Sequence, residues 1–197
     1  MYTTAKTNER YDHIMSSKPK IDVTRFVKQE GNTCGAHSIY NYLVLTNPTT
    51  FTADPGEQRA AIAAIYNKII LPETKEAALP HMMLAFLNTN HAAVTLYGSN
   101  TFKKVLEAIR SQLKIEETIN YDDDPFSVFL KPGDYGIALW QTTEKPLTLD
   151  QLVNMHYTVV YKNADEKIYK LDSNCPDKSW QLVDPKFYLK FMVLLFV

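Results

Sequence analysis

The periodicity of the apolar residues changes once along this chain of 197 residues, close to the run Asp122-Asp-Asp-Pro125. From about residue 34 to residue 113, apolar side chains recur every three or four positions, which is the spacing of one helix face. After residue 125 they fall in short runs rich in β-branched and aromatic residues, which are typical of strands. The sequence therefore predicts an α+β fold in which a helical N-terminal half packs against an antiparallel β-sheet.

Four helices are predicted in the first half. The second has the clearest start, because Asp54 is placed to cap it, Pro55 suits its first turn and Glu57 follows three residues after the cap. Pro80 is predicted to open the third helix. The apolar positions of the four helices are, in order, Ala36, Ile39, Tyr40, Leu43 and Val44; Ala61, Ile62, Ile65, Tyr66 and Ile69; Met83, Leu84 and Leu87; and Phe102, Val105, Leu106, Ile109 and Leu113.

Six strands are predicted from the short apolar runs. They cover residues 92–97, 135–140, 156–161, 168–172, 180–183 and 191–197. The segment between the third and fourth of these contains Asn163 and Asp165, which suit the turn of a β-hairpin. A short capped helix is predicted at residues 148–151.

The length predicts one domain, since a domain has about 150 residues, and 45% hydrophobic residues are enough for its core. We place a single domain at residues 29–197. Residues 1–28 lack strong periodicity and are predicted to form an N-terminal arm.

Charge and composition exclude several functional classes. Twenty-one basic and 22 acidic side chains leave a net charge of -1, so we expect no nucleic-acid partner. The longest apolar run is far shorter than the roughly 20 residues that cross a bilayer, so we expect no membrane insertion. No glycine pattern suits a phosphate, and we expect no cofactor. With no signal-peptide pattern, the expected location is the cytoplasm, or the exterior by export without a classical signal.

The most informative residue is Cys34, which stands where a predicted loop becomes a helix. The backbone N–H groups of the first turn have no acceptor within the helix, and with the positive end of the helix dipole they favour a thiolate there. A thiolate is the form of cysteine that attacks carbonyl carbon. Asn32 or Thr33 is placed to cap the helix, and Gly35 is expected to leave space beside the sulfur. The alternative interpretation is that Cys34 is a small buried side chain.

A histidine and an aspartate are predicted to lie side by side. His156 opens one strand of the predicted hairpin and Asp172 closes the other, so antiparallel pairing brings them to the same sheet edge. The carboxylate can then orient the imidazole while the other ring nitrogen faces a thiolate. A surface histidine and a turn-forming aspartate are the alternatives.

The order Gln29, Cys34, His156 and Asp172 resembles that of the papain-like cysteine peptidase superfamily. The nearer similarity is to the bacteriocin-processing peptidases and to the papain-like effector proteases of bacteria. Two features depart from the bacteriocin-processing branch: the longer interval from Cys34 to His156, and Ser173 where that branch often has proline. The matching stretches are Gln29-Glu-Gly-Asn-Thr-Cys34-Gly35, His156-Tyr-Thr-Val-Val160 and Leu171-Asp172-Ser-Asn.

This resemblance implies a papain-like fold and a cysteine-dependent amide hydrolase, namely a cysteine protease, with a Cys34-His156-Asp172 triad and an acyl-enzyme intermediate. It implies that Gln29 and the Cys34 backbone N–H form the oxyanion hole. The substrate would be a protein or peptide and the chain a monomer, in the manner of a bacterial effector or toxin. A glutamine deamidase or transglutaminase with the same residues, and a non-catalytic binding module, stay open as alternatives.

A zinc site is a further alternative for the same residues. It would join Cys34 and His37, one helical turn apart, with His156 and Cys175. The second pair lacks the close spacing of zinc ligands, so we expect no metal. We expect His37 instead to face the core, and Cys175 to be dispensable and not bonded to Cys34.

Overall fold

The computed structural model describes residues 26–48, 52–70, 78–90, 93–113, 116–142, 144, 155–175 and 179–197. The predicted helix at residues 148–151 and most of the predicted N-terminal arm lie outside these residues. Phe26 and Val27, at the end of that arm, are buried in the core.

The helices of the first half lie where they are predicted. In α3, the Asp54 side chain accepts hydrogen bonds from the backbone N–H groups of Gly56 and Glu57, as its sequence pattern indicates. Two short helices of the second half were not predicted, although each has proline after an aspartate cap. The helices of the described residues are α2 (Cys34–Thr46), α3 (Pro55–Ile69), α4 (Pro80–Asn90), the 3-10 helix η3 (Asn100–Phe102), α5 (Lys103–Leu113), α6 (Pro125–Phe129) and α8 (Pro185–Phe191).

Seven strands form one sheet in the order β2-β1-β7-β3-β4-β5-β6. All neighbours are antiparallel except β1 and β2, which are parallel. The prediction of a purely antiparallel sheet is therefore wrong at one edge, where η3 and α5 connect the parallel pair. The strands are β1 (Leu96–Ser99), β2 (Ile119–Asp122), β3 (Tyr135–Trp140), β4 (His156–Lys162), β5 (Ile168–Leu171), β6 (Trp180–Leu182) and β7 (Met192–Phe196).

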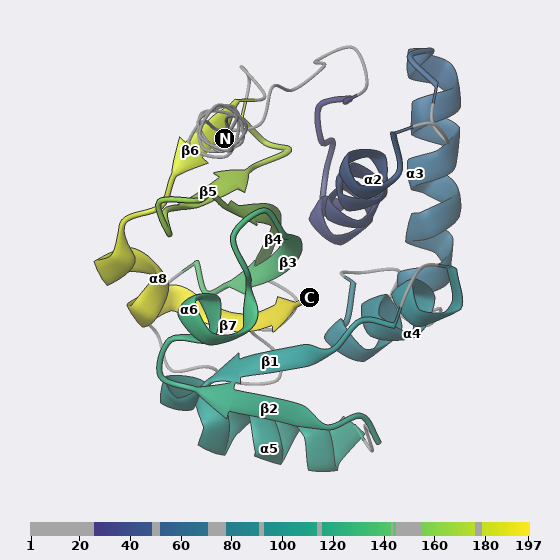
Figure 1. Ribbon diagram of the computed structural model, residues 1–197. Helices are drawn as coiled ribbons and strands as arrows, with labels where there is room; N and C mark the ends of the chain where they lie inside the picture. The colour runs from purple at the N-terminus through teal and green to yellow at the C-terminus, as the bar shows by residue number, and fades with distance from the viewer. Residues whose placement is uncertain are drawn as a thin grey trace, which may run out of the picture.

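Both faces of the sheet are covered (Figure 1). Helix α2 packs on β3 and β4 and lies between the sheet and α3. A second, smaller core on the opposite face contains Phe126 of α6 and Tyr188 of α8, with Trp140 and Val160 of the sheet. The two halves of the sequence are therefore interleaved, because the first half adds β1 to the sheet and the second half adds two covering helices.

The β4–β5 hairpin has the predicted position. Lys162 pairs with Ile168 next to the turn, and Val159 pairs with Leu171 at the other end. Asn163 closes the turn, because its side-chain oxygen accepts a hydrogen bond from the backbone N–H of Lys167 at 2.9 Å. This register brings the start of β4 close to the end of β5.

No helix within the described part of the chain is long and apolar enough to cross a membrane.

Gly35 has a packing role that was not predicted. A Cβ atom at this position would lie 2.5 Å from the Cβ of Ala78 and 3.2 Å from the Sδ of Met83. Its missing side chain therefore serves the close approach of α2 to the segment that leads into α4. The expectation that Gly35 leaves space beside the Cys34 sulfur stays a prediction.

We predict that Gly35→Ala destabilises the protein. The new Cβ overlaps with Ala78, and such overpacking typically costs about 1–3 kcal/mol, against roughly 1 kcal/mol that alanine contributes as a better helix former. Urea unfolding followed by tryptophan fluorescence measures the difference. The double variant Gly35→Ala/Ala78→Gly removes the overlapping atom and should recover part of the loss. A single variant as stable as the wild type would contradict the overlap.

Candidate active site

Cys34 is the first residue of α2 and is partly buried. Thr33 precedes it at the N-cap position, but its side chain makes no capping hydrogen bond. The Thr33 hydroxyl donates instead to the carbonyl of Glu30 at 2.7 Å and so closes the preceding loop. The prediction of a side-chain cap at Asn32 or Thr33 is therefore wrong. The first backbone N–H groups of a helix have no acceptor within it, so they lie uncapped beside the sulfur.

His156 and Asp172 form a hydrogen-bonded pair at the sheet edge. The Nε2 of His156 lies 2.8 Å from the Oδ1 of Asp172, and both side chains are more than four-fifths buried. The carboxylate is held on its own loop, because Oδ1 also accepts from the backbone N–H of Asn174 at 2.9 Å. Lys170 adds a positive charge, with its Nζ 3.9 Å from Oδ2.

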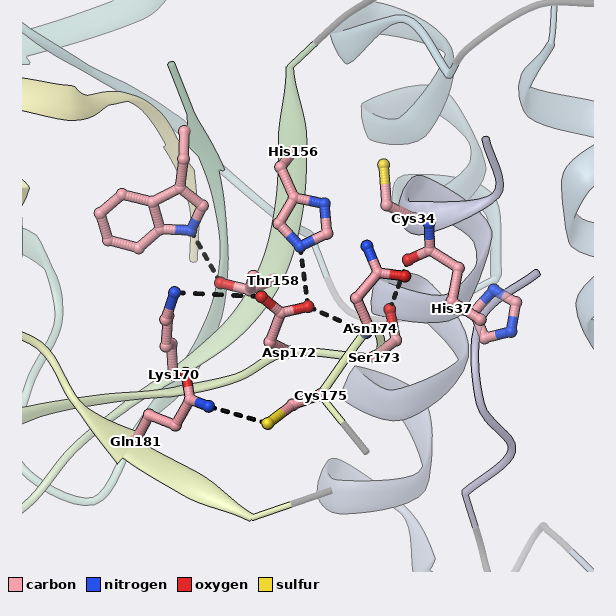
Figure 2. A network of polar contacts seen from close by, with 12 residues as sticks. Cys34, His37, His156, Thr158, Lys170, Asp172, Ser173, Asn174, Cys175 and Gln181 are labelled. Carbon is pink, nitrogen blue, oxygen red and sulfur yellow. Dashed lines mark hydrogen bonds and ion pairs between the residues drawn. The ribbon is translucent and has the colours of Figure 1, made fainter. Parts of the chain in front are cut away.

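Cys34 lies next to this pair. Figure 2 shows the imidazole of His156 between the carboxylate of Asp172 and the side chain of Cys34. The Sγ of Cys34 lies 3.8 Å from the carbonyl oxygen of Met155, the residue before His156. A side-chain hydrogen bond with Cys34 also acts on His156. Three residues that are distant in the sequence thus come together where α2 begins, β4 begins and β5 ends.

The contacts among Cys34, His156 and Asp172 shift the pKa values of the histidine and the aspartate. Burial, the largest influence on His156, lowers its pKa, but the hydrogen bonds and charges of Asp172 and Cys34 outweigh it and raise the pKa to about 9. Burial raises the pKa of Asp172, yet the hydrogen bond and positive charge of His156 leave it below its ordinary value. At neutral pH the pair is therefore an imidazolium next to a carboxylate.

Gln29 lies beside the loop that carries Asp172. It is buried, and its Oε1 accepts a hydrogen bond from the Ser173 hydroxyl at 2.7 Å. Its Nε2 donates to the carbonyl of Gly31 at 2.9 Å, and its backbone N–H donates to the carbonyl of Ser173 at 3.1 Å. The Gln29 amide is thus held in one orientation. Ser173 was not predicted to have any role in the site, although it directly follows Asp172.

Neither Cys34 nor Cys175 is in a disulfide. Cys175 lies on the loop after β5, where its Sγ is 2.9 Å from the Nε2 of Gln181, which donates to it. The described residues hold no group of three or more histidine, cysteine or acidic side chains that could bind a metal. Cys34, His37, His156 and Cys175 are all described, so the alternative zinc site is not formed. His37 is buried, as expected.

No protein-family model, curated protein or solved structure matches this chain.

We predict that His156 titrates near pH 9 and that Asp172→Asn lowers this value, because the variant loses the negative charge and weakens the hydrogen bond. NMR of protein labelled with nitrogen-15 at histidine follows the titration, and His156→Gln assigns the signal among the five histidines. Since the folded-state pKa lies above the ordinary 6.5, the stabilisation that this shift contributes is complete below about pH 6.5. It is lost as the pH rises through about 9. Titration of the wild type near pH 6.5 would contradict the arrangement.

Proposed function

We propose that this protein is a papain-like, cysteine-dependent amide hydrolase that acts on proteins or peptides. One observation carries the proposal: His156, hydrogen-bonded to Asp172 on one side, faces a cysteine at the N-terminus of α2 on the other. A nucleophile, a base and a group that orients the base are the parts that nucleophilic acyl transfer requires.

The first half of the reaction forms an acyl-enzyme. The Cys34 thiolate attacks the carbonyl carbon of the substrate amide, and the electron pair of the C=O bond moves to its oxygen. This attack forms a C–S bond. When the tetrahedral intermediate collapses, the C=O bond re-forms, the C–S bond stays and the C–N bond breaks. His156 carries a proton at neutral pH and transfers it to the departing nitrogen, so that an amine leaves and a thioester stays on Cys34.

The second half releases the acyl group. The neutral His156 takes a proton from water, and the resulting hydroxide attacks the thioester carbon. The C–S bond breaks, and the product leaves as a carboxylic acid while Cys34 returns to the thiolate beside an imidazolium. Asp172 stabilises the positive charge and orients the ring in both halves, so its contribution is smaller than that of His156.

The tetrahedral oxygen needs hydrogen-bond donors. The backbone N–H of Cys34 is free of intrahelical acceptors by its position at the start of α2. The Gln29 amide nitrogen carries two N–H donors, and the bond to Gly31 uses one, which leaves the second for a substrate oxygen. One donor of this kind typically accounts for about 3 kcal/mol of barrier. The Ser173–Gln29 hydrogen bond supports the assignment, because it keeps the Gln29 nitrogen turned away from Ser173.

We predict that Cys34→Ala abolishes turnover and leaves the fold intact, since alanine suits a helix start but has no nucleophile. His156→Ala should lose nearly as much activity, and Asp172→Ala clearly less. Mass spectrometry of a proteome treated with wild type or Cys34→Ala measures the reaction. New N-termini that depend on Cys34 support a protease, whereas glutamines heavier by about 1 Da would indicate a deamidase. A Cys34→Ala protein with wild-type activity would refute the proposal.

We predict that iodoacetamide alkylates Cys34 rapidly near pH 6 and Cys175 slowly, because an ordinary thiol has a pKa of about 8.5 and reacts slowly there. The matched variants Cys34→Ser and Cys175→Ser identify which sulfur is labelled in a peptide map. Cys175→Ser should keep wild-type activity with and without reductant. Loss of activity in that variant alone would mean that Cys175 is the nucleophile.

A further inference from the structure

A second buried histidine lies on α2 and takes no part in the proposed triad. His37 is one helical turn after Cys34 and is only 5% exposed. Figure 2 shows it on the side of Cys34 that is turned away from His156. Burying an imidazole is costly unless it is hydrogen-bonded, so its partners indicate what it is used for.

The hydrogen-bond partner of the His37 side chain is a backbone carbonyl of the loop before α2. Its Nδ1 lies 3.0 Å from the carbonyl oxygen of Thr33, and because a carbonyl only accepts, Nδ1 is the donor. The same carbonyl also accepts the backbone N–H of His37 at 3.0 Å, in the first hydrogen bond of the helix. Burial, the largest influence, lowers the pKa of His37, so the ring is neutral at pH 7 and Nδ1 carries its single N–H.

The Thr33 carbonyl directly precedes one of the two proposed oxyanion donors. The carbonyl of Thr33 and the N–H of Cys34 belong to one peptide group, which is planar, so holding the carbonyl sets the direction of the N–H. The other proposed donor, Gln29, lies at the opposite end of the loop, where its backbone N–H is held by the carbonyl of Ser173 at 3.1 Å. The side-chain hydrogen bond of His37 therefore acts at the end of the loop that carries Cys34.

Side-chain packing contributes less than hydrogen bonding to the rigidity of this loop. Glu30, Gly31 and Asn32 are exposed. A cavity of about 250 Å³ lies against the loop and is lined by Thr33 and His37 together with Arg59 and Ile62 of α3. The orientation of the loop thus depends largely on its hydrogen bonds. Thr33 and Gln29 form two of them within the loop, and Ser173 and His37 form the others at its two ends.

We infer that His37 is a positioning residue of the oxyanion hole, which holds the Thr33–Cys34 peptide group in the orientation that acyl transfer needs. This inference rests on the proposed function. It gives His37 no direct contact with the substrate and no part in proton transfer.

The test compares a reaction that develops an oxyanion with one that does not. Hydrolysis of p-nitrophenyl acetate passes through a tetrahedral oxyanion, whereas alkylation of Cys34 by iodoacetamide does not. We expect His37→Leu to lower kcat/KM for the ester on the order of 10- to 100-fold, the range for a misplaced group near the chemistry. The alkylation rate should stay within about twofold of the wild type, since the inference leaves the nucleophile and its base unchanged.

Two matched variants complete the experiment. His37→Asn places an amide N–H near the position of Nδ1 and should recover much of the ester activity. Ser38→Ala alters the neighbouring buried polar side chain of α2 and should keep both rates. Urea unfolding checks that all three variants are folded at the assay temperature.

Each outcome separates the inference from the proposed function. If His37→Leu keeps the wild-type ester rate, or loses ester hydrolysis and alkylation equally, the positioning role is wrong while the proposed function stands. If the wild type itself does not hydrolyse the ester, both are overturned. A selective loss of ester hydrolysis that His37→Asn restores supports the inference.

Discussion

The register of β4 against β5 is the constraint on which the candidate site depends. Side chains alternate between the faces of a strand, so a slip by one residue would turn His156 away from Asp172. The slip is opposed by the turn, where Asn163 accepts from Lys167, and by the burial of Val159 opposite Leu171. The hydrogen bond between His156 and Asp172 is thus a consequence of apolar packing and turn geometry several residues away.

Cys34 is positioned by packing of a different kind. Helix α2 carries Cys34 and is pressed between the sheet and α3, with Gly35 in contact with Ala78. A larger residue at position 35 would displace the first turn of the helix, and the sulfur lies on that turn. The loop before the helix is held mainly by hydrogen bonds, so the two sides of the site differ in how they resist displacement.

Local signals account for what the sequence could predict. The start of α3 is indicated by neighbouring residues, Asp54 as the cap and Pro55 in the first turn. The hairpin between His156 and Asp172 is indicated by two apolar runs that flank a polar turn. The edge strand β2 was missed because Ile119 is its only buried residue. The hydrogen bond between Ser173 and Gln29 joins positions 144 residues apart, so no local pattern indicates it. The Thr33 hydroxyl bonds to the Glu30 carbonyl rather than capping, a choice that depends on the path of the loop.

The position of β7 has a consequence for the order of assembly. This strand lies in the middle of the sheet, between β1 and β3, although it comes last among the strands along the chain. During synthesis, β1 and β3 have emerged from the ribosome long before residue 196, yet they cannot join in one sheet until β7 is inserted between them. Contacts between such distant segments form slowly. The continuous seven-stranded sheet is therefore completed only after β7, although Cys34, His156 and Asp172 all lie on segments that are translated earlier.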